Sequence, residues 1–171
     1  MIVVRVVLAL GAALLLHFVG TWLWAGFPMS FDPFLVVIVY FALRLGPVSA
    51  QLLGLAGGLI LDGVSGTVWG LHGFAGTLIG FGVSVSAQRV VVGQRGVRVL
   101  LFAAASAAQQ LILASLILLV TSRPHLPPLG WSAGRVAATA LAGWVVLTAE
   151  ERLQRQWRTW QRQRSGRLRF R

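Results

Sequence analysis

The chain has 171 residues, of which 57% are hydrophobic and only 11% are charged. Soluble domains carry roughly 25% charged residues, so this composition excludes an ordinary soluble domain and indicates an integral membrane protein. The formal net charge is +11, and the absence of cysteine excludes a disulfide framework and thiol chemistry.

The first predicted helix covers residues 4–25. No charge occurs between Arg5 and Asp32, and this run is long enough for a helix that crosses the roughly 30 Å hydrocarbon core. The run resembles a signal peptide, but no small-x-small cleavage pattern follows it. We therefore expect an uncleaved membrane span.

The next two predicted helices cover residues 33–44 and 47–62. Arg44-Leu45-Gly46-Pro47 separates them, because proline favours a helix start and disfavours helix at the residue before it. The helix over 33–44 is short, so it is either half-length or extended by Phe27 to Asp32. A single long kinked helix, which would reduce the spans to five, is the alternative.

Three further charge-poor segments predict helices over residues 67–88, 98–121 and 132–152. The expected fold class is therefore all-α, a polytopic membrane protein with six transmembrane helices and both termini in the cytoplasm. Residues 1–152 form the transmembrane domain, and residues 153–171 form a basic cytoplasmic tail.

The distribution of arginine favours six spans over five. With six spans and a cytoplasmic N-terminus, only Arg123 and Arg135 lie outside, as the positive-inside rule requires. Five spans would leave Arg44 within the membrane. The outer ends then carry Asp32 and Asp62 and an aromatic belt of Trp22, Trp24, Trp69 and Trp131.

Small residues follow one face of the predicted helix 67–88 at spacings of three and four. They are Gly66, Gly70, Gly73, Thr77, Gly80 and Ser84, and helix 47–62 offers Gly54, Gly57 and Gly58. Close packing of small faces drives helix association in lipid. The simpler interpretation is that these two helices pack together; the alternative is that a partner's helix docks there.

Several polar residues fall within the predicted spans. They are His17, Gln51, His72, Ser106, Gln109 and Gln110. Polar side chains in a bilayer face the bundle and bond there, so interhelical hydrogen bonds are preferred over ligand binding. Gln109 and Gln110 point about 100° apart on a helix, so one is expected toward the interior and the other toward a neighbour.

The tail from Glu150 to Arg171 is amphipathic. Leu153, Trp157 and Trp160 recur on one helical face, and Arg152, Arg155, Arg158 and Arg162 surround it. Such a helix is expected to bind anionic lipid headgroups on the inner leaflet, with a cytoplasmic protein as the alternative. Nucleic acid is not expected as a partner. Ser165 to Arg171 are expected to be disordered.

No catalytic or cofactor site is expected. The His and Asp residues lack metal-ligand spacing, and no glycine-rich nucleotide loop occurs. Gly63-Val64-Ser65-Gly66 resembles the nucleophile segment of rhomboid intramembrane proteases, but His17, His72 and His125 do not lie in that family's context. We therefore expect a protein that is not an enzyme, with no metal and no cofactor.

The stretch from Pro33 to about Val90 resembles the rod shape-determining protein family MreD. PFLVVIVYFALRLG matches that family's apolar helix, and GGLILDGVSGTVWGLHG matches its glycine-rich helix, aspartate, glycine turn and GLH segment. The family's marked positions correspond here to Pro33, Gly58, Asp62, Gly66, Gly70 and His72. The first helix and the last two helices carry no matching signature.

The resemblance implies a membrane scaffold of the complex that elongates the bacterial cell wall in the cytoplasmic membrane. Its expected partner is the bitopic protein MreC, and through it MreB filaments, the RodA glycosyltransferase and a penicillin-binding transpeptidase. The implied fold is similar to that of the substrate-binding subunits of energy-coupling-factor vitamin transporters. Such a vitamin-binding subunit is the alternative function.

The sequence leaves two interpretations of the motif open. Asp62 either caps the start of the next helix by accepting backbone N–H bonds, or shapes an outward pocket together with His72. The glycine face, with Gly73 and Gly80, is expected to present a flat groove to the single helix of MreC.

Overall fold

The computed structural model describes residues 2–66, 68–89, 94–120 and 128–167, and for residues 95, 129, 154 and 157–167 only the backbone. All elements in this part of the chain are helices. They are α1 (Ile2–Leu23), α2 (Phe27–Ser30), α3 (Pro33–Ala42), α4 (Pro47–Ser65), α5 (Leu71–Arg89), α6 (Arg95–Val120) and α7 (Leu129–Arg167). The predicted all-α fold is confirmed.

The helix starts follow from local chemistry. Asp32 accepts a hydrogen bond from the backbone N–H of Leu35 at 3.0 Å, and Pro33 takes the first helical position of α3. Pro47 has the same position in α4, after the extended Gly46. The two prolines therefore make α3 and α4 separate helices, and the alternative of one long kinked helix is wrong.

Contacts between helices show which helix ends lie at the same end of the bundle. Asp32 contacts Arg135 near the start of α7, whereas Arg44 contacts Glu150 further along the same helix. The hydroxyl of Ser84, near the end of α5, donates to the carbonyl of Leu45 at 2.6 Å. The bundle thus has one end near Asp32 and another near Leu45, and α3 and α4 run in opposite directions between them.

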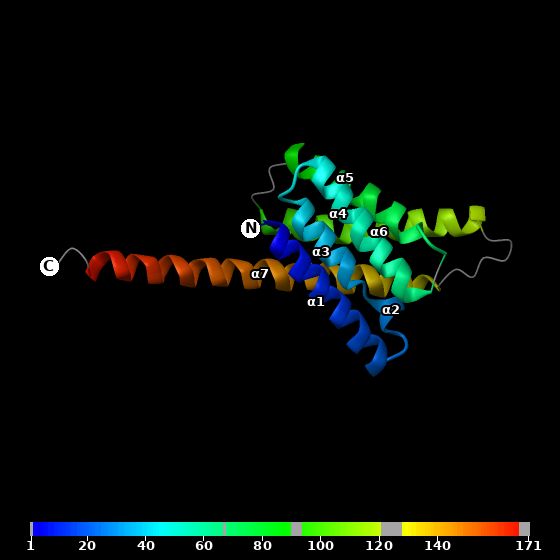
Figure 1. Cartoon of the computed structure of the whole chain (residues 1–171), viewed down its shortest axis with the longest axis horizontal. Helices are drawn as coiled ribbons and strands as arrows, with labels where there is room; N and C mark the ends of the chain where they lie inside the picture. Colours follow the sequence, from blue (N-terminus) through cyan, green and yellow to red (C-terminus); the bar gives the residue numbers. More distant parts are fainter. Residues whose placement is uncertain (1, 67, 90–93, 121–127, 168–171) are drawn as a thin grey trace.

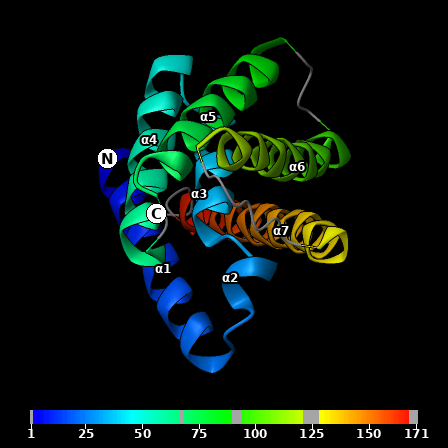
Figure 2. The same cartoon turned by 90° about the vertical axis from the view of Figure 1, so that its right-hand side faces the viewer.

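Helix α3 forms the centre of the bundle. It lies among the longer helices in Figure 2, and it packs against α1, α4, α5, α6 and α7. Eight of its ten residues are buried, among them Phe34, Leu35 and Val39. Phe102 of α6 and Leu147 of α7 complete the core around it.

In the part of the chain that the structure describes, four helices are long and apolar enough to cross a membrane. They are α1, α4, α6 and α7 within the bounds Ile2–Leu23, Pro47–Ser65, Gly96–Val120 and Gly130–Leu153. Helix α3 has ten residues and spans about 15 Å, roughly half of a hydrocarbon core. Helix α5 has 19 residues but is rich in glycine and serine, and its small face packs on α4 rather than on lipid.

The tail is not a separate element. Helix α7 runs without a break from Leu129 to Arg167, across the boundary expected at residue 152, and extends far beyond the other helices (Figure 1). Ser165, expected to be disordered, is still helical, and residues 168–171 lie outside the described part. The start of α1 and the end of α7 point to the same side of the bundle (Figure 1).

Candidate functional site

Asp62, near the end of α4, holds the turn that leads into α5. Its carboxylate is fully buried and accepts three backbone N–H groups: Gly70 at 3.0 Å, His72 at 3.1 Å and Gly73 at 3.1 Å. The first N–H groups of a helix have no partner within it, so a carboxylate there satisfies them and interacts favourably with the helix dipole. The cap predicted for Asp62 is therefore confirmed.

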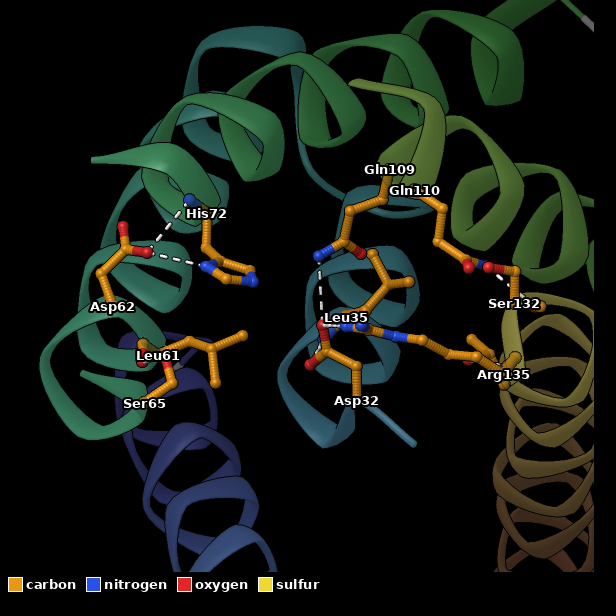
Figure 3. Close-up of polar contacts among 11 residues, drawn as sticks. Asp32, Leu35, Leu61, Asp62, Ser65, His72, Gln109, Gln110, Ser132 and Arg135 are labelled. Atoms are coloured by element: carbon orange, nitrogen blue, oxygen red, sulfur yellow. Dashed lines mark hydrogen bonds and ion pairs between the residues drawn. The ribbon is translucent and has the colours of Figure 1, made fainter. Parts of the chain in front are cut away.

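His72 makes a second type of bond to the same carboxylate. Its Nδ1 lies 2.7 Å from Oδ1 of Asp62, and its ring points away from α4 toward the middle of the close-up in Figure 3. A carboxylate oxygen accepts, so Nδ1 carries a proton, and in the neutral ring this makes Nε2 an acceptor. The pair thus both closes the turn and presents a ring nitrogen beyond it.

Two glycines give the turn its shape. Gly66 ends α4 with φ 63°, and Gly70 precedes α5 with φ 93°; both values are in the left-handed region that glycine adopts without strain. A side chain at either position would meet open space, so backbone conformation and not crowding requires glycine there. Gly66, Gly70, Asp62 and His72 thus form one structural unit.

The remaining motif glycines pack α4 on α5. A Cβ on Gly58 would lie 2.2 Å from the carbonyl oxygen of His72, and a Cβ on Gly54 would lie 2.0 Å from that of Gly76. At Gly80 the corresponding atom is the carbonyl oxygen of Ala50, at 2.2 Å. Such contacts bring two backbones together, so the prediction that these helices pack on each other is confirmed.

This packing corrects the expected partner groove. Gly73 and Gly80 are buried, and both are covered by α4: a Cβ on Gly73 would lie 3.0 Å from the side chain of Leu59. A partner helix has no access to this face in the folded chain. The proposal of a flat groove at Gly73 and Gly80 is therefore wrong.

A second buried carboxylate links three helices. The side chain of Asp32 is buried, with 2% exposure. In addition to capping α3, it accepts hydrogen bonds from Nη2 of Arg135 at 2.8 Å and from Nε2 of Gln109 at 3.1 Å (Figure 3). Pro33, the other marked position of the motif, follows it and is buried. Asp32 thus joins α3 to α6 and α7 at the same end of the bundle as the glycine turn.

The two glutamines of α6 divide as predicted. Gln109 is buried and bonds inward to Asp32, whereas Nε2 of Gln110 donates to the carbonyl of Ser132 in α7 at 3.1 Å. Both are interhelical hydrogen bonds, which confirms the preferred interpretation for these two glutamines, whereas Oγ of Ser106 and Nδ1 of His17 have no partner among the described residues. The ion pair of Asp32 with Arg135 was missed, although these are two of the few charged residues expected at the outer ends.

Between these two groups lies a cavity of about 1140 Å³. Its polar lining includes His17 of α1, His72 of α5, Gln110 of α6 and the pair of Asp32 with Arg135. Apolar residues make up much of the remaining wall, and among them are Leu61, Leu71, Leu113, Ala114 and Ile117. His72 lines this cavity but Asp62 does not, so only the His72 part of the pocket considered for these two residues has a counterpart.

His17 is the least satisfied of the cavity residues. It is 5% exposed and packs on Phe34 with 6.1 Å between ring centroids. Within the described residues its Nδ1 has no hydrogen-bond partner. A buried polar group without a partner costs roughly 1–3 kcal/mol, so His17 retains hydrogen-bonding capacity that the described residues do not use.

The opposite end of the bundle is held by more exposed ion pairs. Arg44 pairs with Glu150 and lies 4.1 Å from the ring centroid of Tyr40, and Arg98 pairs with Glu151 at 3.2 Å. Burial lowers the pKa of the Arg44 guanidinium, but its interactions with Tyr40 and Glu150 raise it above its usual value. These pairs tie the beginning of the basic tail to the bundle.

In the segment that resembles the rhomboid nucleophile, Ser65 and His72 bond to different groups. The hydroxyl of Ser65 donates to the carbonyl of Leu61 within α4, and Nδ1 of His72 bonds to Asp62. His125 lies outside the described residues. In the part of the chain that the structure describes, no three His, Asp or Glu side chains gather as metal ligands do.

The tail residues expected to contact lipid are only partly described. Arg152 and Arg155 are exposed. For Trp157, Arg158, Trp160 and Arg162 the structure gives the helical backbone but not the side chains. The expected amphipathic pattern therefore stays a prediction.

Comparison of the chain with protein families, with characterised proteins and with solved structures finds no match.

Proposed function

We propose that this protein is a non-enzymatic membrane scaffold of the bacterial cell-wall elongation complex, similar to MreD. The observation that carries the proposal is the unit around Asp62. The residues through which the sequence resembles that family, Gly58, Asp62, Gly66, Gly70 and His72, act together in one capped turn. Chance enrichment in glycine and leucine does not produce a buried aspartate at the centre of such a turn.

The proposed topology has six spans with both termini in the cytoplasm. Support comes from the two ends of the bundle. Asp32 and Asp62 lie at one end, and the basic residues Arg44 and Arg98 lie at the other, close to the start of the tail. The second end is then cytoplasmic by the positive-inside rule. Trp24 and Trp131 stack at the first end with 5.9 Å between centroids, as an interfacial belt would.

The surface proposed for the helix of MreC is now α1. This helix is the least buried of the four long apolar helices: 11% of its most apolar 18-residue stretch is buried. Gly11 and Ala12 are exposed, and a Cβ on Gly11 would meet open space. Small exposed residues allow a second helix to approach closely. The other proposed partners, MreB, RodA and a penicillin-binding transpeptidase, are reached through MreC, while the tail binds anionic lipid headgroups.

Affinity purification from bacterial membranes in mild detergent, with mass spectrometry of proteins and small molecules, tests the proposal. We expect MreC in stoichiometric amount, and its loss when Gly11 and Ala12 are both replaced by Leu. A matched Val3→Leu variant, changed on the exposed face of the same helix, should retain MreC. Absence of MreC from the wild-type preparation would contradict the proposal.

The cavity supports a second candidate, the vitamin-binding subunit of an energy-coupling-factor transporter. The cavity volume of about 1140 Å³ is sufficient for a small organic ligand, since such pockets usually have about 300–1,000 Å³. This candidate predicts that the same purification recovers a vitamin together with a transmembrane coupling subunit and a pair of ATPases. The scaffold predicts none of these.

A further inference from the structure

We propose that the cavity between α1, α4, α5, α6 and α7 binds a membrane lipid with an uncharged, hydroxyl-bearing headgroup, such as a diacylglycerol. The inference goes beyond the scaffold function, because it concerns a ligand of this chain and not a protein partner. It rests on the charge balance of the cavity, the bonds that its polar groups leave unused, and the nature of its rim.

The charges in the wall are already neutralised within the chain. Asp32 accepts three hydrogen bonds, including the one from Arg135, and Asp62, which does not itself line the cavity, accepts four from Gly70, His72 and Gly73. Both carboxylates are buried, with 2% and 0% exposure. A cationic headgroup would meet only Asp32, which already accepts three hydrogen bonds, and an anionic one would meet Arg135, which already pairs with that carboxylate. Both would lose hydration without an ionic partner, so an uncharged group is favoured.

The unused capacity consists mainly of neutral hydrogen-bonding atoms. Nδ1 of His72 bonds to Asp62, so Nε2 of the neutral ring is an acceptor, and Gln110 uses its Nε2 on Ser132 and has its carbonyl oxygen as a further acceptor. His17 lines the cavity, is 95% buried and has no partner at Nδ1 among the described residues. Acceptors of this type pair with hydroxyl or amide donors on a ligand.

The rim indicates that the ligand comes from the bilayer. Met29, Val68 and Leu111 line the cavity and are also 58%, 52% and 69% exposed. A mouth that opened only to water would leave these apolar side chains unfavourably hydrated. In a bilayer they contact acyl chains instead, so a lipid reaches the polar groups from the side while its chains remain along α6.

The experiment uses the full-length protein in nanodiscs and a diacylglycerol with a photoactivatable diazirine in one acyl chain. We expect saturable labelling, with label on peptides of α6 or the start of α7. Unlabelled diacylglycerol should compete at least tenfold better than phosphatidylglycerol or phosphatidylethanolamine. Equal competition by the three lipids, or preferred competition by either phospholipid, would overturn the proposal.

Two variants localise the site. Ala114→Phe fills part of the cavity. His17→Phe removes the imidazole without a partner and keeps an aromatic ring. Each variant should reduce labelling at least fivefold. Ala104→Phe places the same ring on an exposed position of α6 outside the cavity and should leave labelling unchanged. Circular dichroism and the melting temperature confirm that each variant is folded.

The result is separable from the scaffold proposal. If labelling behaves as expected but MreC does not co-purify, the lipid site stands and the scaffold function fails. If MreC co-purifies but labelling of wild type and Ala114→Phe is equal, the scaffold stands and the lipid site is overturned. If a vitamin from the purification blocks labelling, the lipid site is overturned in favour of the transporter subunit.

Discussion

Nδ1 of His72 lies 2.7 Å from Oδ1 of Asp62, the carboxylate that also accepts the backbone N–H of His72 itself. One residue thus meets the carboxylate with both its backbone and its side chain. The aspartate of α4 thereby fixes where α5 begins and which way the ring of its second residue points. The capped turn and the cavity wall are consequently parts of one arrangement.

Replacing Asp62 by Ala should be among the most destabilising single changes in the chain. The substitution leaves the N–H groups of Gly70, His72 and Gly73 without their acceptor, and each unsatisfied buried donor costs about 1–3 kcal/mol. We expect a loss of several kcal/mol, measured as the free energy of unfolding in mixed micelles. His72→Phe removes only one bond and should cost about 1–3 kcal/mol. Equal losses for the two variants would contradict the capping role.

The ion pair of Asp32 with Arg135 should show strong coupling. Arg135→Gln leaves a buried carboxylate without its cation, which costs about 3–5 kcal/mol, whereas adding Asp32→Asn removes that charge and preserves an oxygen for the cap of α3. The double variant should therefore be more stable than Arg135→Gln alone. A double-mutant cycle measures the coupling.

A second cycle on Arg98 and Glu151 provides the control for this prediction. Their side chains are 23% and 25% exposed, so the coupling should stay below about 1 kcal/mol. Similar couplings in the two cycles would show that burial of Asp32 does not strengthen its ion pair.

Much of the helical pattern could be predicted, because charge-free runs and prolines are local signals. Asp32, Pro33 and Pro47 mark helix starts by themselves, and the structure places α3 and α4 where these residues indicate. The continuity of α7 was missed because a change from apolar residues to arginine suggests a boundary. Arginine and glutamine nevertheless favour helix, so the backbone continues through that change in composition.

The contacts of the candidate site could be predicted only where the two residues lie close together along the chain. Asp62 and His72 are ten residues apart and belong to one turn, so their meeting follows from the local pattern. Asp32 and Arg135 are 103 residues apart, and no periodicity relates the register of α3 to that of α7. The cavity also depends on this register, and it therefore became apparent only in the folded chain.

Glycine substitutions should separate the packed face of α5 from its open face. Gly80→Ala places a Cβ 2.2 Å from the carbonyl oxygen of Ala50, so α4 and α5 must move apart. Gly82→Ala, two residues later in the same helix, meets open space and should stabilise the helix by up to about 1 kcal/mol. We expect melting temperatures to change in opposite directions for the two variants.

The same pair of variants tests whether crowding is the cause. Gly54 faces Gly76 across the interface, and Gly54→Ala should destabilise as Gly80→Ala does. If Gly80→Ala and Gly82→Ala raised the melting temperature equally, helix propensity would outweigh packing and the close approach of α4 to α5 would not contribute to stability.

The proposed topology predicts which positions an impermeant thiol reagent reaches in intact cells. The chain has no cysteine, so single cysteines can be introduced without background. Replacements at the exposed residues Trp69 and Trp24 should react, because they lie at the end of the bundle that holds the turn and Asp32. Replacements at Arg5 and Arg155 should react only after the membrane is permeabilised. Reaction of Arg5→Cys in intact cells would place the N-terminus outside the cell. If Arg155→Cys remained protected in the same cells, the number of spans would have to be odd.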